Sequence, residues 1–161
     1  MMKKQLLENY LLENIDSAFR FAYTYTRNRE EAEDVVSESV IKALKSVKSL
    51  KEEKNIKPWF YKIIVNTALT HLKRNSKVVY IDYDEMGELN GREDDYSYLS
   101  FESMIKNLDI KYKEIIVMRF FENMPIKEIS QVLGINENTV KTRLYSGLKK
   151  LKIQLEGDVY E

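Results

Sequence analysis

Apolar and small side chains recur every three or four residues between positions 30 and 47. This spacing returns side chains to one face of an α-helix, because a helical turn takes about 3.6 residues. The pattern predicts an amphipathic helix whose buried stripe consists of Ala32, Val35, Val36, Ser39, Val40, Ala43, Leu44 and Val47.

Two other segments of the first half also have helical character. Residues 6–26 indicate one or two helices, and one face of this segment holds Ile15, Ala18, Phe19 and Ala22. A polar loop over 48–57 is followed by Pro58, which suits the first turn of a helix because its missing N–H has no partner there. We expect that helix to run to about Arg74.

The second half opens with a segment of different composition. Residues 77–102 show no stable period and carry eight Asp and Glu against two Lys and Arg. Such a charge density disfavours a packed core. We therefore expect an acidic linker here.

Helical spacing returns after the linker. One predicted helix is marked by Tyr112, Ile115, Ile116, Arg119 and Phe120. Pro125 opens a shorter helix with a stripe of Ile126, Ile129, Val132 and Leu133, and Gly134 ends it. The last helix is expected to bury Val140, Leu144, Leu148, Leu151 and Leu155. Asn136 is its predicted N-cap, because an Asn side chain can accept a backbone N–H.

These elements predict an all-α protein of two small helical domains, 1–76 and 103–161, joined by a flexible acidic linker over 77–102. The second domain has a helix-turn-helix layout, in which the second helix of the pair enters the DNA major groove. The outer face of that helix offers short polar and basic groups, which suit base edges and phosphates. The candidate DNA-binding residues are Asn138, Thr139, Lys141, Thr142, Arg143, Tyr145, Ser146 and Lys149.

The charge distribution supports an interaction with DNA, although the 26 basic and 26 acidic residues sum to zero. Residues 1–76 carry 14 basic and 10 acidic residues, and residues 103–161 carry 10 and 8. The segment 139–152 holds five basic residues and no acidic one. A solvated lysine-rich face on a helix that only packs is the alternative interpretation, and the absence of acids in this segment favours DNA.

The composition also limits the chemistry. The chain has no Cys, and His71 is its one His. No catalytic set, phosphate-binding Gly loop or metal-ligand spacing is present. No apolar run approaches the roughly 20 residues that span a bilayer. We expect a cytoplasmic, non-enzymatic protein without cofactor, metal, small-molecule substrate or membrane insertion.

Two outer faces in the first domain are candidate binding surfaces. On the 30–47 helix, an apolar residue lies among acids and polar groups, as in an interface with a basic protein or on an ordinary surface: the residues are Asp34, Ser37, Glu38, Ile41 and Lys45. The 58–74 helix combines cations, an amide and an indole, a mixture that suits unpaired DNA: its residues are Trp59, Lys62, Asn66, Lys73 and Arg74. Trp59 could equally be a core residue, and for Tyr61 the core is favoured.

Three motifs resemble extracytoplasmic-function sigma factors of bacterial RNA polymerase. The segment 29–38 (REEAEDVVSE) is similar to that family's polymerase-binding helix, and 59–66 (WFYKIIVN) with Lys73-Arg74 is similar to its promoter-melting helix. The segments 126–135 and 139–144 resemble its helix-turn-helix region. The chain departs from the common pattern at Ser37, Thr70, Lys73 and Asn138.

The resemblance implies a mechanism and a set of partners. The 30–47 face would dock on the clamp coiled coil of the polymerase β′ subunit, and the second domain would contact the β flap. The 58–74 face would capture unpaired bases of the −10 promoter element, and the last helix would read the −35 element. An anti-sigma factor, commonly membrane-anchored, would hold the protein inactive in an envelope-stress or related response. Toxin-gene and bacteriocin-gene sigma factors are also similar.

Two other classes of protein are compatible with parts of the pattern. A stand-alone helix-turn-helix regulator would bind operator DNA as a dimer, but residues 1–76 show no clear dimerisation or ligand domain. A protein-interaction adaptor would not need the basic segment 139–152. Binding to DNA without polymerase separates the regulator from a sigma factor.

Overall fold

The computed structural model describes residues 2–75 and 101–160, with side chains up to residue 153 in the last helix. Residues 76–100, which make up most of the predicted linker, lie outside the described residues, as does the side chain of Leu155. The described residues are helices, turns and short connections without a strand, and the chain divides into two compact units. The predicted all-α fold of two helical domains is confirmed.

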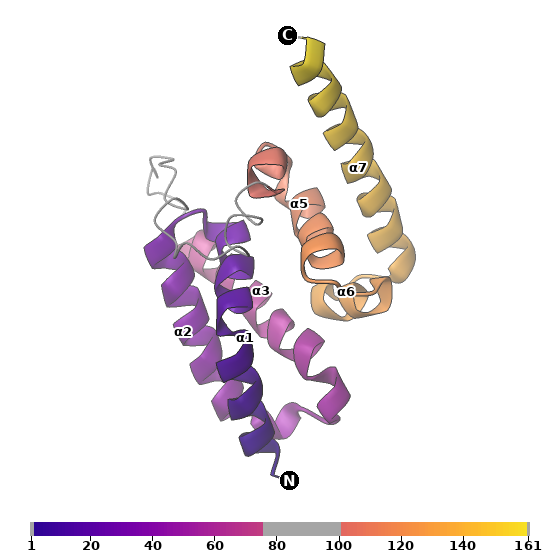
Figure 1. Ribbon diagram of the computed structural model, residues 1–161. Coiled ribbons are helices and arrows are strands. Elements are labelled where there is room, and N and C mark those ends of the chain that lie inside the picture. The colour runs from indigo at the N-terminus through magenta and orange to yellow at the C-terminus, as the bar shows by residue number, and fades with distance from the viewer. Residues whose placement is uncertain (1, 76–100, 161) are drawn as a thin grey trace. The chain divides into compact units, whose positions relative to one another are not determined.

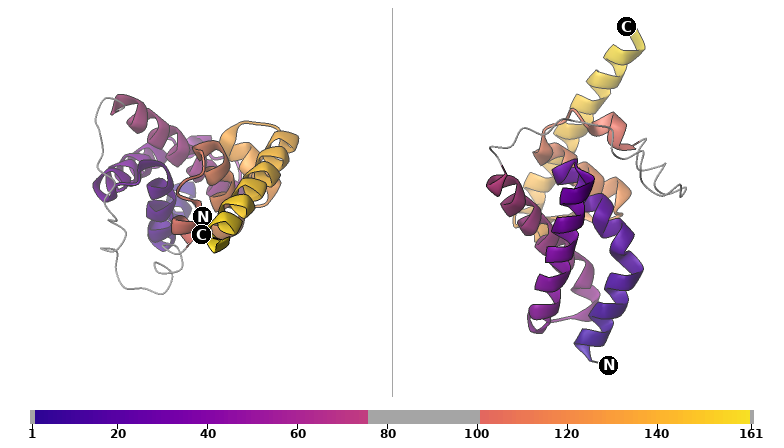
Figure 2. Two further views of the ribbon diagram at one scale, coloured as in Figure 1. Left: turned by 90° about the horizontal axis from the view of Figure 1, so that it is seen from above. Right: turned by 90° about the vertical axis from the view of Figure 1, so that its left-hand side faces the viewer.

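The first unit consists of three long helices, α1 (Lys3–Thr26), α2 (Arg29–Lys45) and α3 (Ile56–Arg74). Two short 3₁₀ turns, Val47–Ser49 and Glu53–Asn55, connect α2 to α3. Each of the three helices packs against the other two (Figures 1 and 2). This arrangement buries one stripe of α2 and one of α3 and leaves their opposite faces exposed, whereas the residues of α1 from Arg20 to Thr26 are all buried.

Aromatic residues fill the centre of this unit. Phe21 of α1 packs on Tyr61 of α3 with ring centroids 4.7 Å apart, and it meets Tyr25 edge-on at 5.5 Å. Tyr61 is only 1% exposed, so its predicted place in the core is confirmed. The stripe predicted for 30–47 contributes five buried members: Ala32, Val35, Val36, Ser39 and Ala43. Its other three predicted members are only partly buried: Val40, Leu44 and Val47.

The face predicted for the first helix is partly wrong. Ala18 and Ala22 are buried, but Ile15 is 41% exposed. The reason is a kink at Asn14, whose backbone is non-helical (φ −120°, ψ 15°) and whose side-chain amide donates to the Tyr10 carbonyl at 2.8 Å. The side chain replaces part of the helical ladder, so the buried stripe changes direction at this point.

The second unit begins with helical residues 101–105, followed by α5 (Ile110–Ile116), a π-helical turn η4 (Val117–Phe121), α6 (Ile126–Leu133) and α7 (Glu137–Tyr160). The predicted cap signals are confirmed here. Gly134 ends α6 with a left-handed φ of 68°, and Asn136 Oδ1 accepts the Thr139 N–H at 2.8 Å.

The π-helical turn corrects the prediction that one regular helix contains both Ile116 and Phe120. The Glu122 N–H donates to the Val117 carbonyl, five residues back, at 2.9 Å. The wider turn shifts the angular position of the residues that follow. Ile115 and Ile116, which precede the turn, are buried, whereas Arg119 and Phe120, which lie within it, are exposed.

The contact between α5 and α7 depends on a glycine. A Cβ at Gly147 would lie 3.0 Å from Tyr112 Cβ and 3.1 Å from Ile116 Cδ1. The absence of a side chain lets α7 approach α5 closely, although Gly is a poor helix former. This approach sets the position of the outer face of α7.

We expect Gly147→Val to destabilise the second unit by about 1–3 kcal/mol, because the added side chain overpacks the α5–α7 contact. Valine is a better helix former than glycine, so a loss of stability must come from sterics. Urea unfolding, followed by helical circular dichroism, measures the change. Ser146→Val, one residue earlier, is the control and should have a smaller effect. Equal stability of the two variants would contradict the close packing.

Candidate nucleic-acid and protein interfaces

The structure gathers the candidate polymerase-binding residues on the outer face of α2. Ile41 is 52% exposed, Asp34, Ser37 and Lys45 are also exposed, and Glu38 is partly exposed. Lys42 Nζ lies 3.9 Å from Glu38 Oε1 and donates to Thr67 Oγ1 at 3.2 Å. The face thus carries an exposed isoleucine among charged groups, and one of its neighbouring lysines ties α2 to α3.

Capping and charge placement stabilise α2 in this position. Asn28 accepts the Glu31 N–H on its side-chain oxygen at 2.9 Å. Glu30 and Glu31 occupy the first turn, and Lys42 and Lys45 lie in the last turn. The cap satisfies a backbone N–H at the start of the helix. The acidic first turn and the basic last turn interact favourably with the helix dipole.

The candidate −10 residues line the outer side of α3. Lys62, Asn66, Lys73 and Arg74 are exposed. Trp59 is partly exposed, and its indole N–H donates to Ser49 Oγ at 3.0 Å. The Ser49 hydroxyl in turn donates to the Ser46 carbonyl at 2.7 Å. The loop before α3 therefore fixes the indole at the edge of this face.

Two residues at this face were not predicted from the sequence. Leu69 is 46% exposed and lies three residues after Asn66 and four before Lys73, on the same side of α3. Its spacing was the available signal. Ser49 belongs to a loop ten residues from Trp59, and no periodicity reveals such a contact.

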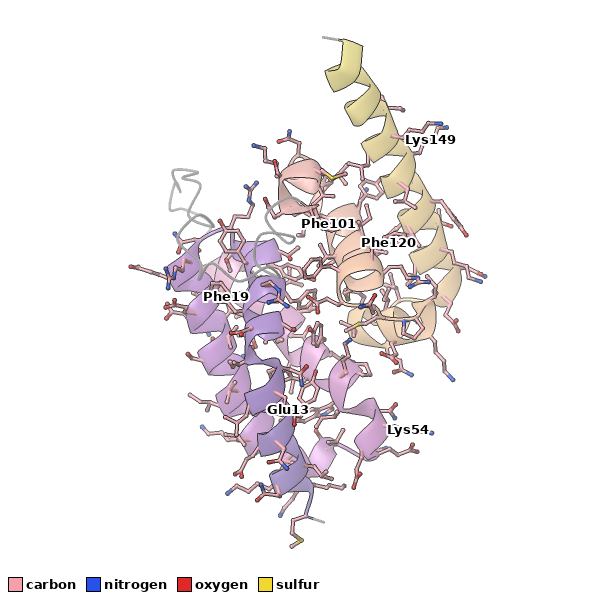
Figure 3. The ribbon with its side chains drawn as sticks, viewed as in Figure 1. Glu13, Phe19, Lys54, Phe101, Phe120 and Lys149 are labelled. Atoms are coloured by element: carbon pink, nitrogen blue, oxygen red, sulfur yellow. The ribbon has the colours of Figure 1, made fainter. Side chains whose placement is uncertain are left out.

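The outer face of α7 holds the candidate −35 residues. Asn138, Lys141, Thr142, Tyr145 and Lys149 are exposed, and Tyr145 is 68% exposed. Lys149 projects away from the helix (Figure 3). The partly exposed members of the set are Thr139, Arg143 and Ser146. On the opposite side, Val140 is fully buried and Leu144 is 6% exposed, which orients the helix.

Some side chains of α7 are engaged locally. The Thr142 hydroxyl donates to the Asn138 carbonyl at 2.9 Å. Its proton is therefore used, and its oxygen can only accept a hydrogen bond from a bound molecule. The Lys150 ammonium lies 5.6 Å from the centroid of the Tyr112 ring, within cation–π range. Lys150 thus contacts a ring of α5, although it is exposed like Lys149.

The described residues include no group of three or more His, Cys, Asp or Glu side chains that could hold a metal ion. In the same part of the chain, no helix combines the length and apolar character that a membrane crossing requires. The candidate surfaces are an exposed apolar–acidic face on α2, an aromatic and cationic face on α3, and a helix-turn-helix with a polar and basic outer face on α7.

Comparisons with known proteins match both units of the chain to bacterial sigma-factor families. Residues 11–78 match the family model described as Sigma-70 region 2, and residues 98–151 match Sigma-70, region 4. The chain is 40% identical to RNA polymerase sigma factor SigV of Bacillus subtilis (strain 168), over 96% of each chain. It is 26% identical to ECF RNA polymerase sigma factor SigW of the same organism, over 87% of this chain and 83% of SigW.

Solved structures share the fold. The sigma factor RpoE of Bartonella quintana, in complex with the anti-sigma factor NepR, superposes with a TM-score of 0.76 at 20% identity, covering 92% of this chain and 96% of that one. CnrH, in complex with the cytosolic domain of CnrY, gives a TM-score of 0.70 at 17% identity, covering 94% and 88%. The chain belongs to the extracytoplasmic-function (ECF) family of RNA polymerase sigma factors.

Ser49→Ala should free the Trp59 indole, because its hydrogen-bond acceptor is removed. Trp59 is the single tryptophan of the chain, so its fluorescence reports this site alone. We expect a red-shifted emission and stronger quenching by acrylamide. Ser37→Ala, at an exposed position of α2, is the control. An unchanged emission in the Ser49 variant would show that the hydrogen bond does not hold the indole.

Proposed function

We propose that this chain binds core RNA polymerase and directs it to specific promoters. The observation that carries the proposal is the presence, in one sigma-factor chain, of two different nucleic-acid faces on two separate units. The α3 face combines an indole with cations and an amide, which suits unpaired bases, and the α7 face belongs to a helix-turn-helix, which suits duplex DNA.

In this proposal the first domain (residues 1–76) binds polymerase and the −10 element. The α2 face docks on the clamp coiled coil of the β′ subunit, with Ile41 as the apolar centre and Asp34 and Glu38 facing basic groups. Asn66 hydrogen-bonds an unpaired −10 base. Trp59, fixed by Ser49, supports the edge of the melted DNA.

The second domain (residues 103–161) binds the −35 element as duplex DNA and contacts the β flap. Asn138, Thr139 and Thr142 lie near the start of α7, where a recognition helix meets base edges. Lys149 lies further along the helix and contacts phosphate. The acidic segment 77–102 joins the two domains. Its negative charge resembles that of the nucleic acid that otherwise occupies the polymerase channel.

The proposal includes control by an anti-sigma factor in an envelope-stress or related response. Support comes from the two structural neighbours, since RpoE was solved with the anti-sigma factor NepR and CnrH with the cytosolic domain of CnrY. The partner of this chain would act at the cytoplasmic side, and a membrane anchor on that partner fits the family. The chain itself works in the cytoplasm as an initiation factor and catalyses no reaction.

Run-off transcription with purified core polymerase over a promoter library tests this function. Initiation at defined sites should require the chain and should be lost when either promoter element is scrambled. Without polymerase, the chain should bind the same DNA weakly in a gel shift. Tight, specific binding by the chain alone, without stimulation of transcription, would instead favour a stand-alone helix-turn-helix regulator.

Ile41→Glu should weaken binding to core polymerase at least tenfold, or about 1.4 kcal/mol, because it places a charge at the apolar centre of the docking face. Fluorescence anisotropy of the labelled chain measures this affinity. Leu12→Glu is the matched control, since Leu12 is 79% exposed on α1 and lies outside the docking face. An equal loss in both variants would contradict the assignment of the face.

A further inference from the structure

A polar cluster connects the start of the docking helix α2 to the end of the promoter-melting helix α3. Glu31 Oε1 lies 3.4 Å from His71 Nε2, and it accepts a hydrogen bond from Asn75 Nδ2 at 3.3 Å. The side chains of Glu31 and His71 are 12% and 16% exposed, respectively. Because both side chains are largely shielded from solvent, few water molecules can compete for their contacts.

The α2 end of the cluster, Glu31, is held in place by the cap of its own helix. The Glu31 backbone N–H is capped by the Asn28 side chain at 2.9 Å, which fixes the turn from which the carboxylate extends. Asp34, a residue of the proposed docking face, lies one helical turn further along α2. The carboxylate is therefore part of the same rigid segment that would contact polymerase.

The other side of the cluster holds the turn that carries two candidate DNA-binding cations. Lys73 and Arg74 lie between His71 and Asn75 in sequence, and both are exposed. The last turn of a helix has few backbone hydrogen bonds of its own and frays readily. Anchoring residues on both sides of the two cations to Glu31 restrains this turn.

We propose that Glu31 is a positioning residue for promoter binding: through His71 and Asn75 it holds the last turn of α3, so that Lys73 and Arg74 reach DNA phosphates together. The inference rests on the proposed function. Glu31 itself touches no DNA. Its carboxylate transmits the placement of the docked α2 helix to the cationic end of α3.

The salt dependence of promoter binding by reconstituted holoenzyme tests this proposal. Each phosphate contact contributes about 0.9 to the slope of log affinity against log salt concentration. Glu31→Ala removes the oxygen that accepts from Asn75 and should therefore lower the slope by about one to two, as should Lys73→Ala with Arg74→Ala. Combining all three changes should lower it no further, because residues acting through one contact are not additive.

Glu30→Ala is the matched control. Glu30 is exposed and occupies the same first turn of α2, so its replacement removes the same charge from the helix dipole without touching the cluster. Affinity for core polymerase should stay within about twofold in both variants, a range that separates noncoupled sites from coupled ones. Circular dichroism checks that each variant is folded.

Every outcome is decisive. An equal slope for Glu31→Ala and Glu30→Ala, or a further decrease in the combined variant, would overturn the positioning role. If Glu31→Ala does not fold, Asn75→Ala removes one arm of the cluster and is judged by the same slope and the same combination. If the wild-type chain forms no promoter-bound holoenzyme, the proposed function fails, and that result is distinct from failure of the cluster alone.

Discussion

The structure depends on the packing of apolar side chains between helices, which in the first unit joins α1, α2 and α3 to one another. The core of this unit includes Phe21 of α1 and Tyr61 of α3, whose tilted rings have centroids 4.7 Å apart. Burial of these aromatic side chains stabilises the unit, because it removes large apolar areas from water. The same packing orients the outer faces of α2 and α3. Their candidate binding residues therefore point outward as a result of helix packing.

The features that could be predicted from the sequence are those encoded by near neighbours. The stripe of 30–47, the left-handed Gly134 and the Asn136 cap each rely on residues within about one or two turns. For the same reason the outer face of α2 could be derived: once its stripe is buried, Asp34 and Ile41 must lie on the other side.

The features that could not be predicted depend on tertiary contacts or on local competition for backbone hydrogen bonds. Gly147 matters because Tyr112 lies against it, and Asn75 reaches Glu31 from 44 positions away. The kink at Asn14 arises when a side-chain amide takes a helical carbonyl, an outcome that helix propensity alone does not determine. The position of Trp59 could not be decided from periodicity, because its partner Ser49 lies in an irregular loop.

The π-helical turn at Val117–Phe121 has a consequence for how the second unit tolerates change in chain length. In a regular α-helix, one additional residue rotates everything downstream by about 100°. A turn that closes five residues back accommodates an additional residue within itself. An insertion at this point therefore need not rotate α6 and α7 about the axis of α5. The close packing of α7 on α5 at Gly147, which sets the outer face of α7, can then be kept.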